Sequence, residues 1–201
     1  MARKVFISFR YKDGNKYKEY LSKLFSDSDD VINCSESEDR SRMSEDTIKR
    51  YLYSKLKNTS VTIVLLTPEA INHKKVFNGY NYVYDDWIYD EIKYSLDDRE
   101  NNRCNGLIAV YTPEAKNLVI NSSSNNGVIT IKSFNNLVRK NMFNIKKTYK
   151  HNSKEGLYNA NLDHYCSLVS WEDFVKDFDF YIALAEQKRD NKDQYDISKR
   201  M

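Results

Sequence analysis

Residues 61–67, Val-Thr-Ile-Val-Leu-Leu-Thr, constrain the fold of this chain more than any other segment. The segment is continuously apolar or β-branched, and it shows no alternation of polar and apolar positions. A strand of this kind is buried on both faces, which is typical of a parallel sheet covered by helices on each side. The segment therefore predicts a central strand of an α/β domain.

Four further segments have strand character, namely residues 4–9, 31–34, 106–111 and 165–170. Segments with a helical period separate or follow them, at residues 14–25, 44–56, 86–97 and 171–188. Strand and helix alternate with short links, so right-handed crossovers into a doubly wound sheet are the simplest arrangement. We expect a flavodoxin-like α/β fold with about five parallel strands in the order 2-1-3-4-5.

About fifty residues separate the fourth and fifth expected strands. Within this insertion, residues 113–164, the pattern predicts a β-hairpin from residues 118–121 and 128–131, and a helix over 133–147. No repeat or second core is visible. We therefore expect a single domain over residues 1–189, followed by a polar, frayed tail over residues 190–201.

Composition excludes several classes of partner. Lys and Arg number 32 against 29 Asp and Glu, so the net charge of +3 gives no strong field for nucleic acid. No signal-peptide pattern and no apolar run of membrane-spanning length is present, which predicts a cytoplasmic protein without a membrane partner. Cys34, Cys104 and Cys166 are widely spaced, and we expect them to be reduced thiols.

The expected strand order places a candidate site between strands one and three, because doubly wound sheets bind ligands at the carboxyl ends of the strands where the order reverses. Arg10 and Asp13 lie in the predicted loop after the first strand. They suit a phosphate and a ribose hydroxyl respectively, or alternatively form a salt bridge with each other. The chain has no Gly-x-Gly-x-x-Gly or Walker motif, which argues against a redox dinucleotide site or a P-loop.

Residues 86–97 contribute the second half of the candidate site. Ile88, Ile92 and Leu96 fall on one helical stripe that faces the sheet. Trp87 and Glu91 are four residues apart and share the neighbouring face, which places a carboxylate beside an indole at the rim of the cleft. A solvated helix residue is the plainer interpretation of Glu91 taken alone.

A further pair of residues, His164 and Cys166, has the spacing of neighbours on one face of a strand. His164 and Cys166 are two apart, so on a strand they share a face. Simple packing explains them better than a catalytic Cys/His pair does. We predict that the basic stretch 139–150 is the solvated side of a helix rather than a nucleic-acid site.

Three motifs in the right order carry a resemblance to a known family. Residues 5–10, Val-Phe-Ile-Ser-Phe-Arg, followed by Asp13, resemble the first signature of TIR domains. Residues 61–67 resemble their third strand, and Asp86-Trp87-x-x-x-Glu91-Ile92 resembles the helix that carries the catalytic glutamate of NAD-cleaving TIRs. The likeness covers about residues 3–112. Residues 58–62 and the insertion are most similar to the TIR-like subunit of Thoeris anti-phage systems.

The resemblance implies that NAD+ is consumed as a substrate, so no cofactor is expected. Glu91 would be catalytic, holding the ribose hydroxyls and stabilising positive charge on the sugar. Trp87 would wall the pocket, Phe9 and Arg10 would line its nicotinamide and phosphate side, and Asp13 would help to bind the substrate. Water would give ADP-ribose, and an internal hydroxyl would give a cyclic isomer that signals infection. The implied partners are further copies of the chain or a phage-derived trigger, and a separate effector that recognises the product.

Two alternatives stay open. A TIR-like module can signal by assembly without catalysis, and nucleoside deoxyribosyltransferases share this type of fold and also place a carboxylate at the sugar. Two segments depart from the usual TIR pattern. The loop at residues 69–85 is long and rich in Tyr, and is placed to act as a lid or to block the cleft. The loop at residues 35–43 is acidic and lacks the Pro and Gly typical of the place where TIRs self-associate.

Overall fold

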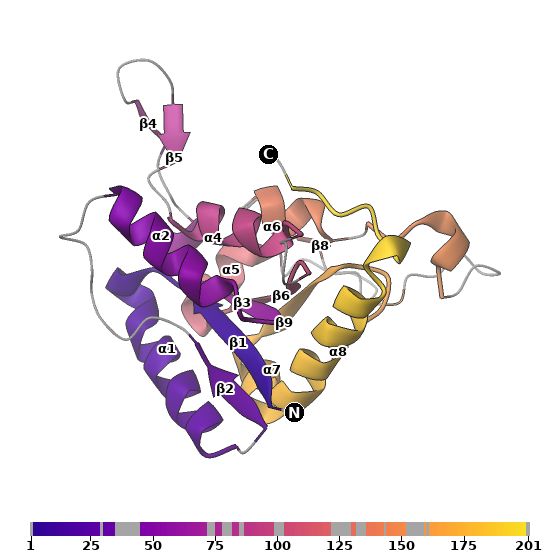
Figure 1. The fold of residues 1–201 in the computed structure, drawn as a ribbon, viewed down its shortest axis with the longest axis horizontal. Coiled ribbons are helices and arrows are strands. Elements are labelled where there is room, and N and C mark those ends of the chain that lie inside the picture. The colour runs from indigo at the N-terminus through magenta and orange to yellow at the C-terminus, as the bar shows by residue number, and fades with distance from the viewer. Residues whose placement is uncertain are drawn as a thin grey trace.

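The sheet at the centre of the molecule has five strands in the order β2-β1-β3-β6-β9, and all neighbours are parallel (Figure 1). The computed structural model describes residues 2–28, 30–34, 45–71, 75–77, 82–84, 87–98, 103–121, 130–131, 136–142, 144–151, 159 and 161–199. The strands are β1 (Arg3–Ser8), β2 (Val31–Asn33), β3 (Val61–Leu66), β6 (Gly106–Tyr111) and β9 (Cys166–Ser170). The predicted α/β class and the order 2-1-3-4-5 are confirmed.

Helices cover both faces of this sheet (Figure 1). One face, the α1 face, packs against α1 (Tyr11–Ser26), α7 (Trp171–Lys176) and α8 (Phe178–Asp190). The other, the α4 face, packs against α2 (Glu45–Leu56), α4 (Trp87–Leu96) and α6 (Asn136–Lys140). The six residues of β3 are all buried between these layers, as their apolar sequence requires.

Several short helices and strands lie in the connections between these main elements. They are α3 (Pro68–Ile71), α5 (Lys116–Val119), the 3-10 helices η1 (Pro113–Ala115), η3 (Lys147–Tyr149) and η4 (Lys192–Gln194), and two antiparallel pairs, β4 (Lys75–Phe77) with β5 (Tyr82–Tyr84) and β7 (Ile120–Asn121) with β8 (Thr130–Ile131). The β4–β5 pair stands off the body of the domain beyond α2 and α4 (Figure 1). In the described ranges, no helix combines the length and apolarity that a bilayer crossing needs.

The first helix begins earlier than predicted. Residues 11–13 form its first turn rather than a loop, and Arg10 is its N-cap. Gly14, expected to mark the start of the helix, lies inside it. A Cβ at this position would come within 3.1 Å of the Phe9 Cβ. The glycine therefore serves the close approach of α1 to the end of β1.

The insertion and the closing helix also differ from expectation. Within the described residues, the predicted hairpin pairs residues 120–121 with 130–131, and residues 116–119 are helical. In the described part of residues 133–147, the predicted helix is seen at Asn136–Lys140, and Ile145 instead forms an isolated bridge with Tyr195. The closing helix is divided at Asp177, whose side chain accepts a hydrogen bond from the first turn of α8.

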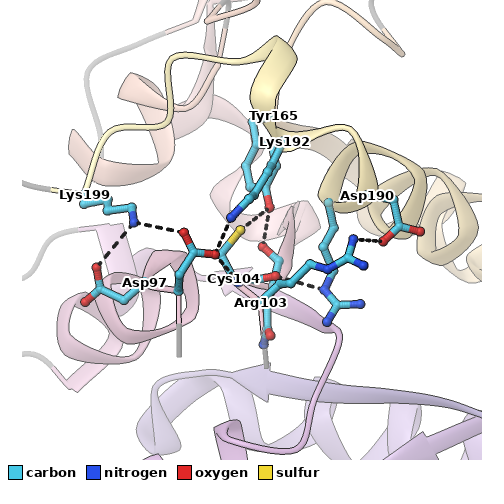
Figure 2. A network of polar contacts seen from close by, with 10 residues as sticks. Asp97, Arg103, Cys104, Tyr165, Asp190, Lys192 and Lys199 are labelled. Carbon is cyan, nitrogen blue, oxygen red and sulfur yellow. Dashed lines mark hydrogen bonds and ion pairs between the residues drawn. The ribbon is translucent and has the colours of Figure 1, made fainter. Parts of the chain in front are cut away.

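The C-terminal segment is docked, so the prediction of a frayed tail is wrong for residues 191–199. The Tyr195 side chain is buried, and its hydroxyl donates to the Leu162 carbonyl at 2.7 Å. The Ser198 amide donates to the Asn141 side chain at 2.9 Å. Lysines of the tail reach the acidic end of α4, where Lys192 contacts Asp98 at 2.5 Å (Figure 2). These contacts lie far apart in sequence, which is why composition gave no sign of them.

A lysine is buried between α8 and β9. Lys188 is 1% exposed, and its ammonium donates to the Ser167 hydroxyl at 2.7 Å. Burial lowers the pKa of Lys188 from 10.5 to about 7. Between those values the unfolded chain binds a proton that the native chain does not, so this residue makes stability rise with pH over that window.

We expect Lys188→Met to be more stable than the wild type at about pH 7, and the difference to shrink by up to about 1.4 kcal/mol per unit as the pH rises toward 9. The reason is that the charged form of Lys188 is penalised only in the native state. Urea unfolding at several pH values measures this, with the exposed Lys176→Met as control. A stability difference that does not change with pH would show that Lys188 keeps an ordinary pKa.

We expect Gly106→Ala to destabilise the fold by about 2 kcal/mol or more. A Cβ at this position of β6 would overlap the backbone carbonyl of Ala185 on α8, and backbone has little room to shift. Gly14→Ala is the comparison variant and should cost less, because its Cβ would come to 3.1 Å from the Phe9 side chain rather than overlap backbone. Thermal unfolding of the two variants tests the ranking, which equal melting temperatures would contradict.

Candidate active site

A buried carboxylate from α4 meets the end of β1. Ile88, Ile92 and Leu96 are at most 2% exposed and pack on the α4 face, which confirms the predicted stripe. Glu91 is drawn in beside them and is 7% exposed, so its interpretation as a solvated helix residue is wrong. The hydroxyl of Ser8, itself fully buried, donates to Oε2 of Glu91 at 2.5 Å. The carboxylate thus lies at the carboxyl end of β1, as the switch-point argument requires.

A chain of hydrogen bonds fixes α4 against the sheet. The Ser95 hydroxyl donates to the Glu91 carbonyl at 2.7 Å, so its single proton is used there. Thr62 on β3 must then donate to the Ser95 oxygen, 2.7 Å away. The Asn105 amide in turn donates to Thr62 at 2.9 Å. All three side chains are buried, and each bond sets the direction of the next, so the chain determines the register of Glu91 along the sheet.

Asp13 links the first turn of α1 to the residues that follow β3. Its Oδ1 accepts from the Thr67 hydroxyl at 2.7 Å, and its Oδ2 accepts from the Glu69 backbone amide at 2.9 Å. Thr67 follows β3, and its hydroxyl oxygen also accepts a hydrogen bond from the Ala70 backbone amide at 3.3 Å. The carboxylate therefore ties the first turn of α1 to the first turn of α3.

The structure places the remaining predicted residues, Phe9, Arg10 and Trp87, differently. Phe9 is half-buried and packs on the α1 face, the opposite side of the sheet from Glu91. Arg10 is half-buried, and its backbone carbonyl accepts a hydrogen bond from the Gly14 amide at 2.7 Å. Trp87 is the first residue of α4, and its side chain lies outside the described residues. The structure thus brings Ser8 and Glu91 together and directs Phe9 away from them.

Two loops predicted to depart from the TIR pattern lie wholly or partly outside the described residues. The loop 35–43 lies outside the described residues. The segment 69–85 contains most of α3 and the β4–β5 pair, and its remaining residues beyond Ile71 lie outside the described ranges. The lid hypothesis for that segment stays a prediction.

The His164–Cys166 pair is a packing feature. Both side chains are buried, and desolvation lowers the pKa of His164 to about 3 and raises that of Cys166 to about 12. A catalytic pair needs the reverse, a thiolate beside an imidazolium. The three cysteines are free thiols, as expected. Among the residues described, no three His, Cys, Asp or Glu side chains gather in a way that would hold a metal ion.

Ser8 is the site residue that sequence reasoning missed. It stands inside an apolar strand, where a serine signals nothing on its own. Its spacing held a weak clue, because Phe6 and Ser8 alternate onto the same face of β1, and the structure shows this to be the α4 face.

Residues 6–117 match the protein family described as Thoeris protein ThsB, TIR-like domain. This segment is more than half of the chain and extends from β1 into α5. It contains Ser8, Asp13 and Glu91, together with the hydrogen-bonded chain behind α4. The match confirms the resemblance inferred from the sequence.

We expect Thr62→Val to destabilise the domain by about 1–3 kcal/mol relative to Thr62→Ser. Valine keeps the shape of threonine but removes the hydroxyl that links Asn105 to Ser95, whereas serine keeps the hydroxyl and loses only a methyl group. Chemical unfolding of both variants measures the difference. Valine as stable as serine would show that the buried chain contributes no net stability.

Proposed function

The chain belongs to the TIR-like domain family of the Thoeris anti-phage protein ThsB, and on that premise we propose that it cleaves NAD+ between nicotinamide and ribose. The observation that carries the proposal is the buried Glu91 carboxylate, held by Ser8 at the carboxyl edge of the sheet. A fixed anion with little contact with water is the group that such a reaction needs.

The chemistry follows from the charge that develops on the sugar. The bond between the ribose carbon and the nicotinamide nitrogen breaks, and its electron pair leaves with nicotinamide, which becomes neutral. No proton donor is needed for this leaving group. The ribose carbon is left as an oxocarbenium-like cation. Glu91 stabilises that cation electrostatically, and the effect is strong because 7% exposure leaves little water to screen it.

Ser8 acts as a positioning residue. Its hydroxyl fixes the orientation of the Glu91 carboxylate at 2.5 Å. The Asn105–Thr62–Ser95 chain holds the backbone behind it. A preorganised carboxylate costs little reorganisation when the cation forms, which is the condition for electrostatic catalysis.

The other predicted residues surround this centre in the proposal. Trp87, one helical turn before Glu91, walls the pocket. Phe9 and Arg10 line its nicotinamide and phosphate side, and Asp13, which ties α1 to the residues after β3, helps to bind the substrate. Water as acceptor gives ADP-ribose, and an internal hydroxyl gives a cyclic isomer. A phage-derived trigger switches the activity on, and a separate effector binds the product.

We expect Glu91→Gln to lower NAD+ consumption by about a hundredfold or more, since it removes the anion while keeping the shape of the side chain. The measurement is NAD+ loss, with mass analysis of products, in cells expressing the chain with and without phage challenge. Glu19→Gln is the matched control, because it makes the same carboxylate-to-carboxamide change at an exposed position of α1, and it should keep wild-type activity.

Three outcomes separate the alternatives. NAD+ loss that stops in Glu91→Gln but not in Glu19→Gln supports the proposal. Intact NAD+ under challenge, with defence equal in wild type and Glu91→Gln, refutes it in favour of a non-catalytic module. Cleavage of free nucleosides in place of NAD+ would identify a deoxyribosyltransferase-like enzyme.

A further inference from the structure

A pocket opens at the carboxyl edge of the sheet, on the side of α1. Its volume is about 350 Å³, and its walls come from the first turns of α1 and from the residues that follow β3 and β6. Tyr17, in its wall, belongs to the core of the α1 face, whereas Glu91 comes from α4 on the opposite face. The volume is within the range of pockets that bind small molecules.

A cluster of charged and polar groups shapes one wall of this pocket. Glu114 accepts from the Lys16 ammonium at 2.8 Å and from the Tyr17 hydroxyl at 2.5 Å. These two hydrogen bonds lower the pKa of Glu114 to about 2, so it is anionic at neutral pH. Lys12 lies one helical turn before Lys16 and contacts Glu69 at 2.6 Å.

The pocket wall also contains a buried hydroxyl without a partner. Thr112 is fully buried, and its Oγ1 makes no hydrogen bond to any group in the described part of the chain. Thr112 is the N-cap residue of η1, yet its side chain does not cap that helix. A buried hydroxyl left unsatisfied costs about 1–3 kcal/mol, so its presence in a pocket wall points to a polar ligand atom.

The chemistry of the walls indicates the class of ligand. The side chains of Lys12 and Lys16 are 75% and 66% exposed, and exposed ion pairs are weak, so both ammoniums can turn to an anion at little cost. Glu114 and Thr112 offer acceptors suited to sugar hydroxyls. We propose that the pocket binds the phosphorylated ribose of a nucleotide, with the phosphate at Lys12 and Lys16 and the sugar hydroxyls at Glu114 and Thr112.

The test is calorimetric titration of the full chain with AMP, adenosine and inorganic phosphate in parallel. Binding of AMP needs no cleavage of NAD+, so the result is independent of the proposed activity. We expect AMP to bind more tightly than either adenosine or phosphate. Thr112→Val and Lys16→Ala should each weaken AMP binding about tenfold, because each removes one polar contact. Lys23→Ala, an exposed change in the last turn of α1, should leave binding unchanged.

Each remaining outcome overturns the proposal. AMP binding that neither variant weakens would place the nucleotide elsewhere, and no AMP binding at millimolar concentration would exclude the site. Phosphate binding as tightly as AMP would mean a simple anion site with no role for the ribose. If Thr112→Val does not fold, Lys16→Ala decides alone, since the Lys16 side chain is 66% exposed.

Discussion

The double burial of β3 is the constraint on which the rest of the structure depends. Its six residues are covered by helices on both faces and paired with β1 and β6 on both edges. Two threonines then connect the strand to the site elements. Thr62 hydrogen-bonds to Ser95 on α4, and Thr67, just past the strand, hydrogen-bonds to Asp13 on α1. The position of both helices at the carboxyl edge is therefore set from the central strand.

The burial of Glu91 follows from the apolar stripe of α4. Since Ile88 and Ile92 must face the core, the neighbouring side chain is carried in with them, and a buried carboxylate is costly unless it is hydrogen-bonded. Ser8 supplies that bond. A group that lowers stability unless it is held in place is the kind of feature that catalysis explains and folding alone does not.

The carboxyl edge carries different chemistry on its two sides. On the α4 side the buried Glu91 carboxylate accepts a hydrogen bond from the Ser8 hydroxyl, which suits stabilisation of a cation. On the α1 side lysines and a carboxylate alternate around a pocket, which suits a phosphate and hydroxyl groups. The Asp13–Thr67 contact lies between α1 and the end of β3 and keeps the two sides in fixed relation.

The sequence by itself determined the parallel sheet, its strand order and the stripe of α4, because the continuous apolar run of residues 61–67 and the helical periodicity of residues 88–96 are local and strong. It also placed Glu91 at the switch point and supported the family resemblance. It did not reveal Ser8 as the partner of Glu91, the use of Asp13 as a tie between α1 and the residues after β3, the Thr112 pocket or the docked tail. Each of these joins side chains distant in the chain, so only the packing of the folded sheet decides which groups meet, and local pattern carries no record of that choice.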